Sequence, residues 1–168
     1  GTATADSTAI SAHGSGNILL KTTSGLLDIN AAVKSGTGNI TIWNTTGAIE
    51  QGAFTVSTDG GTIDVEATHA TNGSITMVAG SSLDTDGSTT NGGNIRVKSG
   101  AGMTVTGIDA GTALVSLLSG ELIEDAGNML TDVVAGTLRL QATSGVGKKD
   151  DHLETSVGTL ILVQVASL

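Results

Sequence analysis

A short motif recurs along this chain: a glycine, a small polar residue, then an isoleucine or leucine that opens an alternating run. Successive copies are 22, 23, 12, 20, 43 and 22 residues apart, so most steps lie near a period in the low twenties. The copies are Gly16-Asn17-Ile18, Gly38-Asn39-Ile40, Gly61-Thr62-Ile63, Gly73-Ser74-Ile75, Gly93-Asn94-Ile95, Gly136-Thr137-Leu138 and Gly158-Thr159-Leu160. A degenerate copy at residues 111–114 falls within the longest gap. This period is typical of a solenoid whose coils stack on one another.

The runs that follow these glycines alternate as β-strands do. In Ile40-Thr41-Ile42, Ile63-Asp64-Val65 and Ile95-Arg96-Val97, one polar residue separates two aliphatic residues, which is the period of a half-buried strand. Glycine, serine, asparagine or aspartate interrupts each run after a few residues. Because no window sustains the spacing of an amphipathic helix, the sequence predicts an all-β chain.

Further short apolar runs predict two or three strands in each coil. They occupy residues 25–29, 47–49, 54–56, 103–105 and 120–123. One coil presents only a thin row of apolar side chains, and a second coil stacked on it buries that row and pairs the strands in parallel. Since parallel crossovers are usually right-handed, we predict a right-handed parallel β-helix of about seven or eight coils, each of roughly 22 residues.

Composition favours a single solenoid domain. The chain has 25 glycines, no proline and no cysteine. Glycine provides the left-handed corners that each coil needs, and the absence of proline removes a residue that would interrupt interior ladders. Because no linker-like block interrupts the repeat, we expect residues 14–168 to form one β-solenoid domain, preceded by an irregular lead-in at residues 1–13.

The charge balance narrows the range of partners. Seven basic and sixteen acidic residues give a net charge of −9, which opposes binding to nucleic acid or to an anionic membrane. No apolar stretch has the length of a membrane span, so we expect no membrane insertion. The lack of cysteine excludes disulfides and thiolate metal sites, and it is compatible with a secreted bacterial protein.

Asparagine occupies the same repeat position in three copies. Asn17, Asn39 and Asn94 each precede the first inward aliphatic residue of a run. If these residues stack at one corner of the coils, we expect their side-chain amides to form a hydrogen-bonded ladder along the rod and to satisfy the backbone of the turn. This role is structural, and the hydroxyl residues of the other copies would interrupt the ladder.

Acidic residues are the first candidates for chemistry. Asp64 and Glu66 lie two apart on the outward face of one strand, and Glu121, Glu124 and Asp125 follow later. Because carboxylates on neighbouring coils can act as general acid and base, a β-helix enzyme or binder for acidic polysaccharide is the alternative function. The chain has one tryptophan, one phenylalanine and no tyrosine to form sugar-stacking platforms. We therefore interpret these carboxylates as solvated surface residues and predict no catalytic residue.

One loop has the spacing of a pair of calcium ligands. Asp84 and Asp86 lie two apart before Gly87, so their oxygens could converge on a hard cation. The loop lacks the later glutamate of an EF-hand and the tandem pattern of calcium-binding nonapeptides. We interpret it as a solvated Asx-turn with no bound cofactor, and Ca²⁺ remains the alternative.

Threonine residues suggest a third hypothesis, an ice-binding solenoid. Thr41, Thr76 and residues 104–106 supply threonines within alternating runs. Ice recognition would need flat, regular rows of threonine, and the sequence does not repeat them coil after coil. We therefore place this hypothesis behind the other two.

Most of the chain from about Gly14 onward resembles a known family. The similarity is carried by the Gly-Asn-Ile-Thr-Ile style of coil and by residues 119–125, 138–140, 145–147 and 153–160. These resemble repeats of filamentous-haemagglutinin-like exoproteins and giant bacterial surface adhesins. The resemblance implies a secreted right-handed β-helix that serves as a fibrous stalk or adhesive structure at the bacterial cell surface. It supplies no catalytic residues, and the N-terminal secretion domain of such exoproteins is not visible in this sequence.

The last apolar run predicts an assembly surface. Residues 160–166 form one of the most apolar stretches of the chain and contain no charge. The side chains expected at this end are Leu160, Leu162, Val163 and Val165. Unpaired strand edges and an exposed core row can be covered by another coil that stacks on them. We therefore expect either a longer native chain or head-to-tail stacking of subunits. The sequence thus favours an extracellular structural or adhesive fibre, and it does not identify a receptor.

Overall fold

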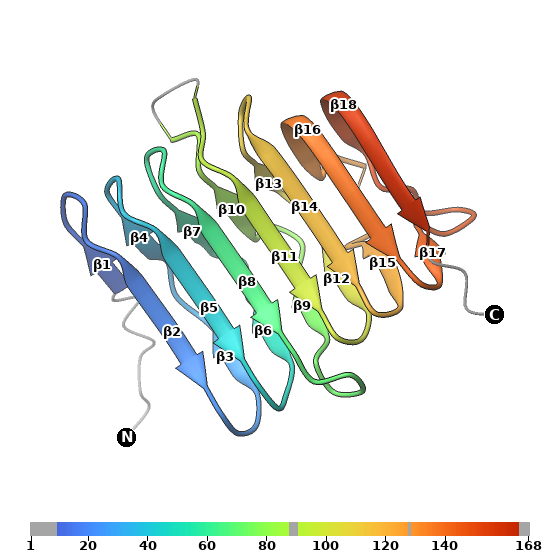
Figure 1. Ribbon diagram of the computed structural model, residues 1–168, viewed down its shortest axis with the longest axis horizontal. Helices are drawn as coiled ribbons and strands as arrows, with labels where there is room; N and C mark the ends of the chain where they lie inside the picture. The colour runs from blue at the N-terminus through green and yellow to red at the C-terminus, as the bar shows by residue number, and fades with distance from the viewer. Residues whose placement is uncertain (1–9, 88–90, 128, 165–168) are drawn as a thin grey trace.

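The computed structural model describes residues 10–87, 91–127 and 129–164, and these residues form a β-solenoid without helices (Figure 1). Successive coils advance from the blue end to the red end of the molecule, and the chain winds around the axis in a right-handed sense. All pairs of named strands are parallel and join one coil to the next. The predicted fold class, a right-handed parallel β-helix, is therefore confirmed, with about seven coils in the described residues.

Each full coil places strands on three faces, named A, B and C in the order in which the chain visits them. Face A consists of β2 (Ile18–Thr22), β5 (Ile40–Asn44), β8 (Ile63–Ala67), β11 (Ile95–Ser99), β14 (Leu114–Ser119) and the second halves of β16 (Val133–Ala142) and β18 (Thr155–Gln164). Its strands are the longest of the regular coils. They contain most of the alternating runs that follow the repeated glycine.

The strands of faces B and C are shorter. Face B consists of β3 (Leu27–Ile29), β6 (Ile49–Gln51), β9 (Ile75–Met77), β12 (Met103–Val105), β15 (Leu122–Asp125) and β17 (Gly145–Val146). Face C consists of β1 (Ile10–Ala12), β4 (Val33–Ser35), β7 (Thr55–Ser57), β10 (Ser82–Asp84), β13 (Ile108–Asp109) and the first halves of β16 and β18. Faces A and C belong to one twelve-stranded sheet because β16 continues from one face to the other.

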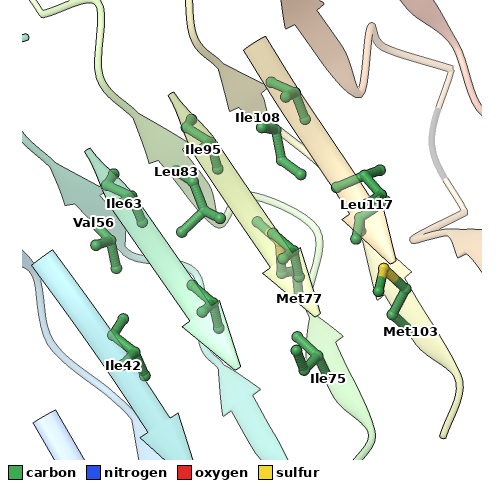
Figure 2. Close-up of a cluster of buried hydrophobic side chains, with 14 of the residues drawn as sticks. Ile42, Val56, Ile63, Ile75, Met77, Leu83, Ile95, Met103, Ile108 and Leu117 are labelled. Atoms are coloured by element: carbon green, nitrogen blue, oxygen red, sulfur yellow. The ribbon is translucent and has the colours of Figure 1, made fainter. Parts of the chain in front are cut away.

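The core is a set of aliphatic rows that run along the rod between the three faces. Figure 2 shows side chains from several coils pointing into the same interior. On face A, Ile40, Ile63, Ile95, Val115 and Leu138 stack in register, and each is at most 1% exposed. The residues between them point outward, as the period-2 alternation of these strands predicts.

The third coil is longer than the repeat spacing predicts. Ile63 pairs in register with Ile95, which follows it by 32 residues. Ile75, which the repeat alignment made equivalent to Ile63, instead lies on face B and pairs with Ile49. That assignment was wrong because an alternating run of three residues fits a strand on any face. Only pairing with the neighbouring coil fixes the face on which such a run lies.

The degenerate copy at residues 111–114 does open a coil, with its inward position shifted by one residue. Val115 stacks between Ile95 and Leu138, whereas Leu114 pairs with Thr137. Val115 is fully buried and Leu114 is half-buried. The long gap in the repeat therefore spans two coils, whose inward rows on face A begin at Ile95 and at Val115.

The repeated glycines do not provide the left-handed corners that the composition led us to expect. Left-handed backbone occurs at other glycines, such as Gly60 with a φ of 89° and Gly107 with a φ of 61°. At Gly93, an added Cβ would collide with the carbonyl oxygen of Gly61 in the coil below, and Gly61 has the same relation to Gly38. These glycines are required because two backbones approach each other closely at this corner.

A column of buried hydroxyls lies beside the stacked glycines. The Ser35 hydroxyl donates to the Gly16 carbonyl at 2.7 Å, and the Thr58 hydroxyl lies 2.7 Å from the Gly38 carbonyl oxygen. Both residues are fully buried, and Thr85 continues the column one coil further. Because buried carbonyls need partners, these hydroxyls stabilise the corner between faces C and A.

The solenoid begins earlier than the predicted domain boundary at residue 14. Residues 10–12 form β1 and pair in parallel with β4. The part of the predicted irregular lead-in that the structure describes is therefore a strand of face C. Residues 1–9 lie outside the described residues.

Candidate functional site

The asparagine column forms hydrogen bonds between coils, although not between amides. The Asn17 side-chain oxygen accepts from the backbone N–H of Asn39 at 2.8 Å, and the Asn39 oxygen accepts from the backbone N–H of Thr62 at 2.9 Å. Asn94 accepts in the same way from the backbone N–H of Leu114 at 3.1 Å. The predicted residues thus link coils, but each bond runs from a side chain to the backbone of the next coil. This role is structural.

The loop after β10 is an Asx-turn. The Asp84 Oδ1 accepts from the backbone N–H groups of Asp86 and Gly87 at 2.9 and 3.0 Å, and Gly87 has a φ of 51°. Among the described residues, the structure does not place Asp84 and Asp86 in a group of three potential metal ligands. The predicted Asx-turn is therefore present, and calcium binding at this loop stays an untested alternative.

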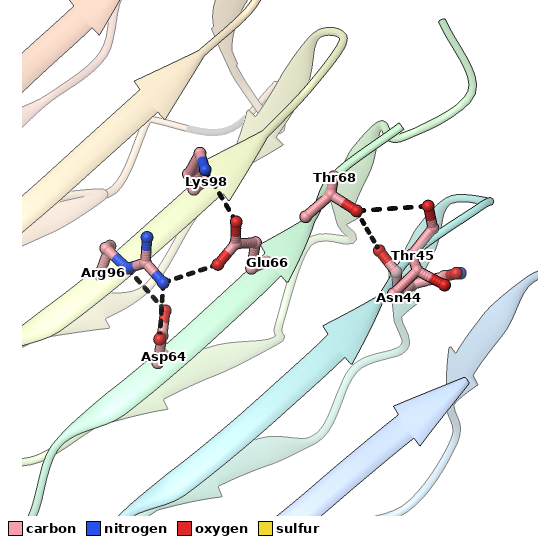
Figure 3. Close-up of polar contacts among 7 residues, drawn as sticks. All are labelled: Asn44, Thr45, Asp64, Glu66, Thr68, Arg96 and Lys98. Carbon is pink, nitrogen blue, oxygen red and sulfur yellow. Dashed lines mark hydrogen bonds and ion pairs between the residues drawn. The ribbon is translucent and has the colours of Figure 1, made fainter. Parts of the chain in front are cut away.

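Asp64 and Glu66 belong to an ion-pair network that joins β8 to β11 on face A (Figure 3). Arg96 contacts both carboxylates at 2.7 Å, and Lys98 contacts Glu66 at 2.8 Å. Burial raises the pKa of Glu66, but hydrogen bonds from Lys98 and Arg96 outweigh it, so the pKa of Glu66 is lowered. The hydrogen bonds that Arg96 donates to the Asp64 carboxylate are the main cause of the raised pKa of Arg96. These carboxylates are held by basic partners in the next coil.

The carboxylates proposed for polysaccharide chemistry do not converge on one cleft. Asp64 lies on face A, whereas Glu124 lies on face B. A shallow hollow of about 420 Å³ on face B is lined by Glu121 and Glu124, together with threonine, serine and small residues. Glu124 is also paired with Lys148 at 2.7 Å, and this contact raises the pKa of Lys148.

The threonine residues do not form a long outward row. Thr76 and Thr104 pair in register on face B. Glu50 flanks them in the coil before, and Glu124 flanks them in the coil after. Charged neighbours therefore interrupt the flat hydroxyl surface that ice recognition would need.

The last described strand, β18, has an unusually apolar exposed surface. Leu160 and Leu162 pair in register with Leu138 and Leu140, which are buried, yet the two β18 residues are 55% and 60% exposed. Val163 pairs with Gln141, which points outward. The residues predicted to form the assembly surface therefore include both inward and outward side chains. Val165 lies outside the described residues. The exposed inward row is the continuation of the core.

Three acidic side chains meet at the corner between faces B and C near this end of the rod. Asp125 ends β15, Asp132 precedes β16 and Glu154 precedes β18. One carboxylate oxygen from each lies within 4.8 Å of the others. Asp132 is fully buried, Asp125 is 5% exposed and Glu154 is half-buried. We call these three residues the acidic cluster.

The stacking register explains why these carboxylates come together. Val133 pairs with Thr155, so the residues just before them, Asp132 and Glu154, occupy equivalent places in adjacent coils. The backbone N–H of Glu154 donates to Asp132 Oδ2 at 2.9 Å. Asp125 pairs with Val105, and it therefore occupies an inward position that is aliphatic in the preceding coil.

Burial and like charge make the cluster electrostatically unfavourable when fully ionised. Burial raises the pKa of Asp132 to about 7, and the neighbouring Asp125 and Glu154 carboxyls add to this rise. The Asp125 carboxyl also raises the pKa of Asp151 nearby. At an effective dielectric constant of about 20, two carboxylates roughly 4.8 Å apart repel by about 3 kcal/mol. A proton or a cation is therefore needed to stabilise this arrangement.

The sequence contained a partial signal for this cluster. Asp132 and Glu154 are 22 residues apart, which is the repeat period. Sequence reasoning singled out Asp125 but missed the other two because the repeat was aligned on its glycines and aliphatic residues. Aligning acidic residues on the same period would have placed this pair in one column.

Comparison with protein-family models, curated proteins and solved structures found no match for this chain. None of the described residues belongs to a helix long and apolar enough to cross a membrane.

Proposed function

We propose that this chain is a structural module of an extracellular bacterial fibre or adhesin stalk, built by stacking one solenoid coil on another. The observation that carries the proposal is the exposed inward row of β18. Leu160 and Leu162 continue a core row whose preceding members are buried, so a further coil placed on β18 would cover them. The resemblance to exoprotein and adhesin repeats supports the same function.

The opposite end of the rod has a matching apolar surface. A hollow of about 560 Å³ is lined by residues of the first strands, including Leu20, Leu27, Ile29 and Val33. An apolar row at one end and an apolar hollow at the other suit head-to-tail contact between copies, which is a heterologous interface and generates filaments when it does not close. We infer that the next coil comes either from a longer chain or from a second copy of this chain, and the second case is the one that forms filaments from separate subunits.

Electron microscopy and sedimentation of the purified chain test this function. We expect thin filaments with an axial repeat of about 34 Å, because seven coils stack at about 4.8 Å each. Leu162→Lys places a charge in the exposed core row and should abolish the filaments. Val78→Lys is the matched control, because Val78 is 42% exposed but lies outside β18.

Isolated rods at every concentration for the wild-type chain would contradict assembly between copies. Equal loss of filaments in the Val78→Lys control would show that the effect is not specific to β18. Circular dichroism of each variant establishes that the coils remain folded.

A further inference from the structure

We propose that Asp125, Asp132 and Glu154 bind one calcium ion at the corner between faces B and C. The three carboxylates come from three separate segments of the chain, and their oxygens approach within 4.8 Å. This site is distinct from the Asp84 loop and goes beyond the fibre function. A bound ion there would tie β15 to the start of both β16 and β18.

Proximity of acidic residues is not the only observation that points to a ligand. Asp132 is fully buried, and its Oδ1 has no hydrogen-bond partner among the described residues. The Glu154 Oε2 is likewise buried without a partner in the described part of the chain. Buried carboxylate oxygens usually have hydrogen bonds or metal ligation. Two such oxygens at one corner are suited to a cation.

The charges around the cluster also favour a cation. Asp151 adds a fourth carboxylate, because Asp125 lies close enough to raise the pKa of Asp151. Lys148, a basic side chain close enough to lower the pKa of Asp151 somewhat, is paired with Glu124 at 2.7 Å. The cluster therefore carries an excess of negative charge when its members are ionised, and a divalent ion would offset much of it.

The donor set selects calcium over other common ions. All three side chains offer hard oxygen ligands and none offers nitrogen or sulfur. Calcium binds oxygen at about 2.3–2.6 Å, so ligands on opposite sides of the ion are about 4.6–5.2 Å apart. Three oxygens that lie within 4.8 Å of one another are close enough to contact one such ion together. Magnesium keeps several waters and needs a near-ideal octahedron, which a corner buried this deeply suits less well.

Isothermal titration calorimetry and thermal unfolding test the site on the full chain after EDTA treatment and dialysis. We expect one Ca²⁺ per chain, and about 5 mM Ca²⁺ should raise Tm by about 5 °C if the affinity is submillimolar. Magnesium at the same concentration should give a much smaller shift.

Asp132→Asn removes one charge while keeping an oxygen that can accept from the Glu154 N–H. We expect it to weaken calcium binding at least tenfold, and the calcium-free variant should remain folded because a repulsive charge has been removed. Glu154→Gln should give the same loss. Asp84→Asn is the matched control, since it changes the other candidate loop and should leave the calcium response intact.

Two results would overturn the proposal. One is the absence of a calcium-dependent heat or Tm shift in the wild-type chain, which we would expect to come with a gain in stability on acidification. That pattern would mean that the carboxyls share protons rather than a metal ion. The other is an unchanged calcium response in Asp132→Asn and its loss in Asp84→Asn, which would place the ion at the Asp84 loop.

Discussion

At the scale of single residues, the solenoid depends on the absence of side chains at one corner as much as on the aliphatic core. Gly93 and Gly61 stack so closely that a Cβ on Gly93 would collide with the backbone of the coil below. The Thr58 hydroxyl is fully buried beside this column and lies 2.8 and 2.7 Å from the carbonyl oxygens of Gly36 and Gly38, either of which can accept its one hydrogen. The corner therefore selects glycine for its size and a hydroxyl residue for its hydrogen bond.

Replacing a stacked glycine should destabilise the chain. We expect Gly93→Ala to lower the free energy of unfolding by about 2–3 kcal/mol, because the added methyl group can be accommodated only by moving two coils apart. Gly102→Ala is the control: its nearest atom would lie 3.6 Å away and its φ is not left-handed. Urea unfolding measures both variants, and a Gly93→Ala protein as stable as Gly102→Ala would contradict this steric role.

At the scale of elements, parallel register decides which polar side chains meet. Asp64 pairs with Arg96 and Glu66 pairs with Lys98, so the network on face A joins β8 to β11 across the longest coil. In the same face, Lys21 lies over the ring of Trp43, with the ammonium 4.1 Å from the ring centre. The Thr68 hydroxyl lies 3.2 Å from the Thr45 carbonyl oxygen in the coil before (Figure 3).

The ion pairs of Glu66 should make stability fall in acid. Because the folded-state pKa of Glu66 lies below its usual value, its contribution is present above about pH 4.5 and is lost as the pH falls through the folded-state pKa. Glu66→Gln should cost about 1 kcal/mol at neutral pH, and the difference from wild type should shrink at low pH.

Chemical denaturation of Glu66→Gln across this pH range measures the effect. Glu50→Gln is the control, because Glu50 lies outward on face B and forms no ion pair among the described residues. A difference between Glu66→Gln and wild type that stays constant down to low pH would contradict the assigned role of Glu66.

At the scale of the whole molecule, each coil of the described residues pairs its strands with the coils directly before and after it. The central strand β8 has paired neighbours on both sides, β5 and β11, whereas β2 pairs only with β5 within the described sheet. Stability in such a stack is approximately a sum of coil and interface contributions, so the ends should open before the middle.

Hydrogen exchange should therefore show a gradient along the rod. We expect the amides of β8 and β11 to exchange at least tenfold more slowly than those of β2 in dilute solution, because opening β2 breaks one interface between coils rather than two. Native-state exchange measured by NMR or mass spectrometry gives the rates. Uniform protection along the chain would mean that the solenoid opens only as one cooperative unit.

The alternating runs and their period were sufficient to predict strands, stacking and the parallel fold. Ile40, Ile63 and Ile95 were assigned to inward rows from local pattern alone, and they stack in register as predicted. The pattern did not predict that Ile75 lies on face B. It also did not predict the short strands β4, β10 and β13, since strands of two or three residues leave too little periodicity to recognise.

The sequence by itself determined the fold class, because a period-2 pattern repeated about every 22 residues can bury its aliphatic side chains only by stacking coils. The tertiary structure alone decided which coil is long, which glycines are sterically required, and that Asp125 meets Asp132 and Glu154. The physical reason is that alternation is local, whereas register and close approach depend on the neighbouring coil. Insertions such as the one between Ile63 and Ile95 change the sequence spacing without changing which residues stack.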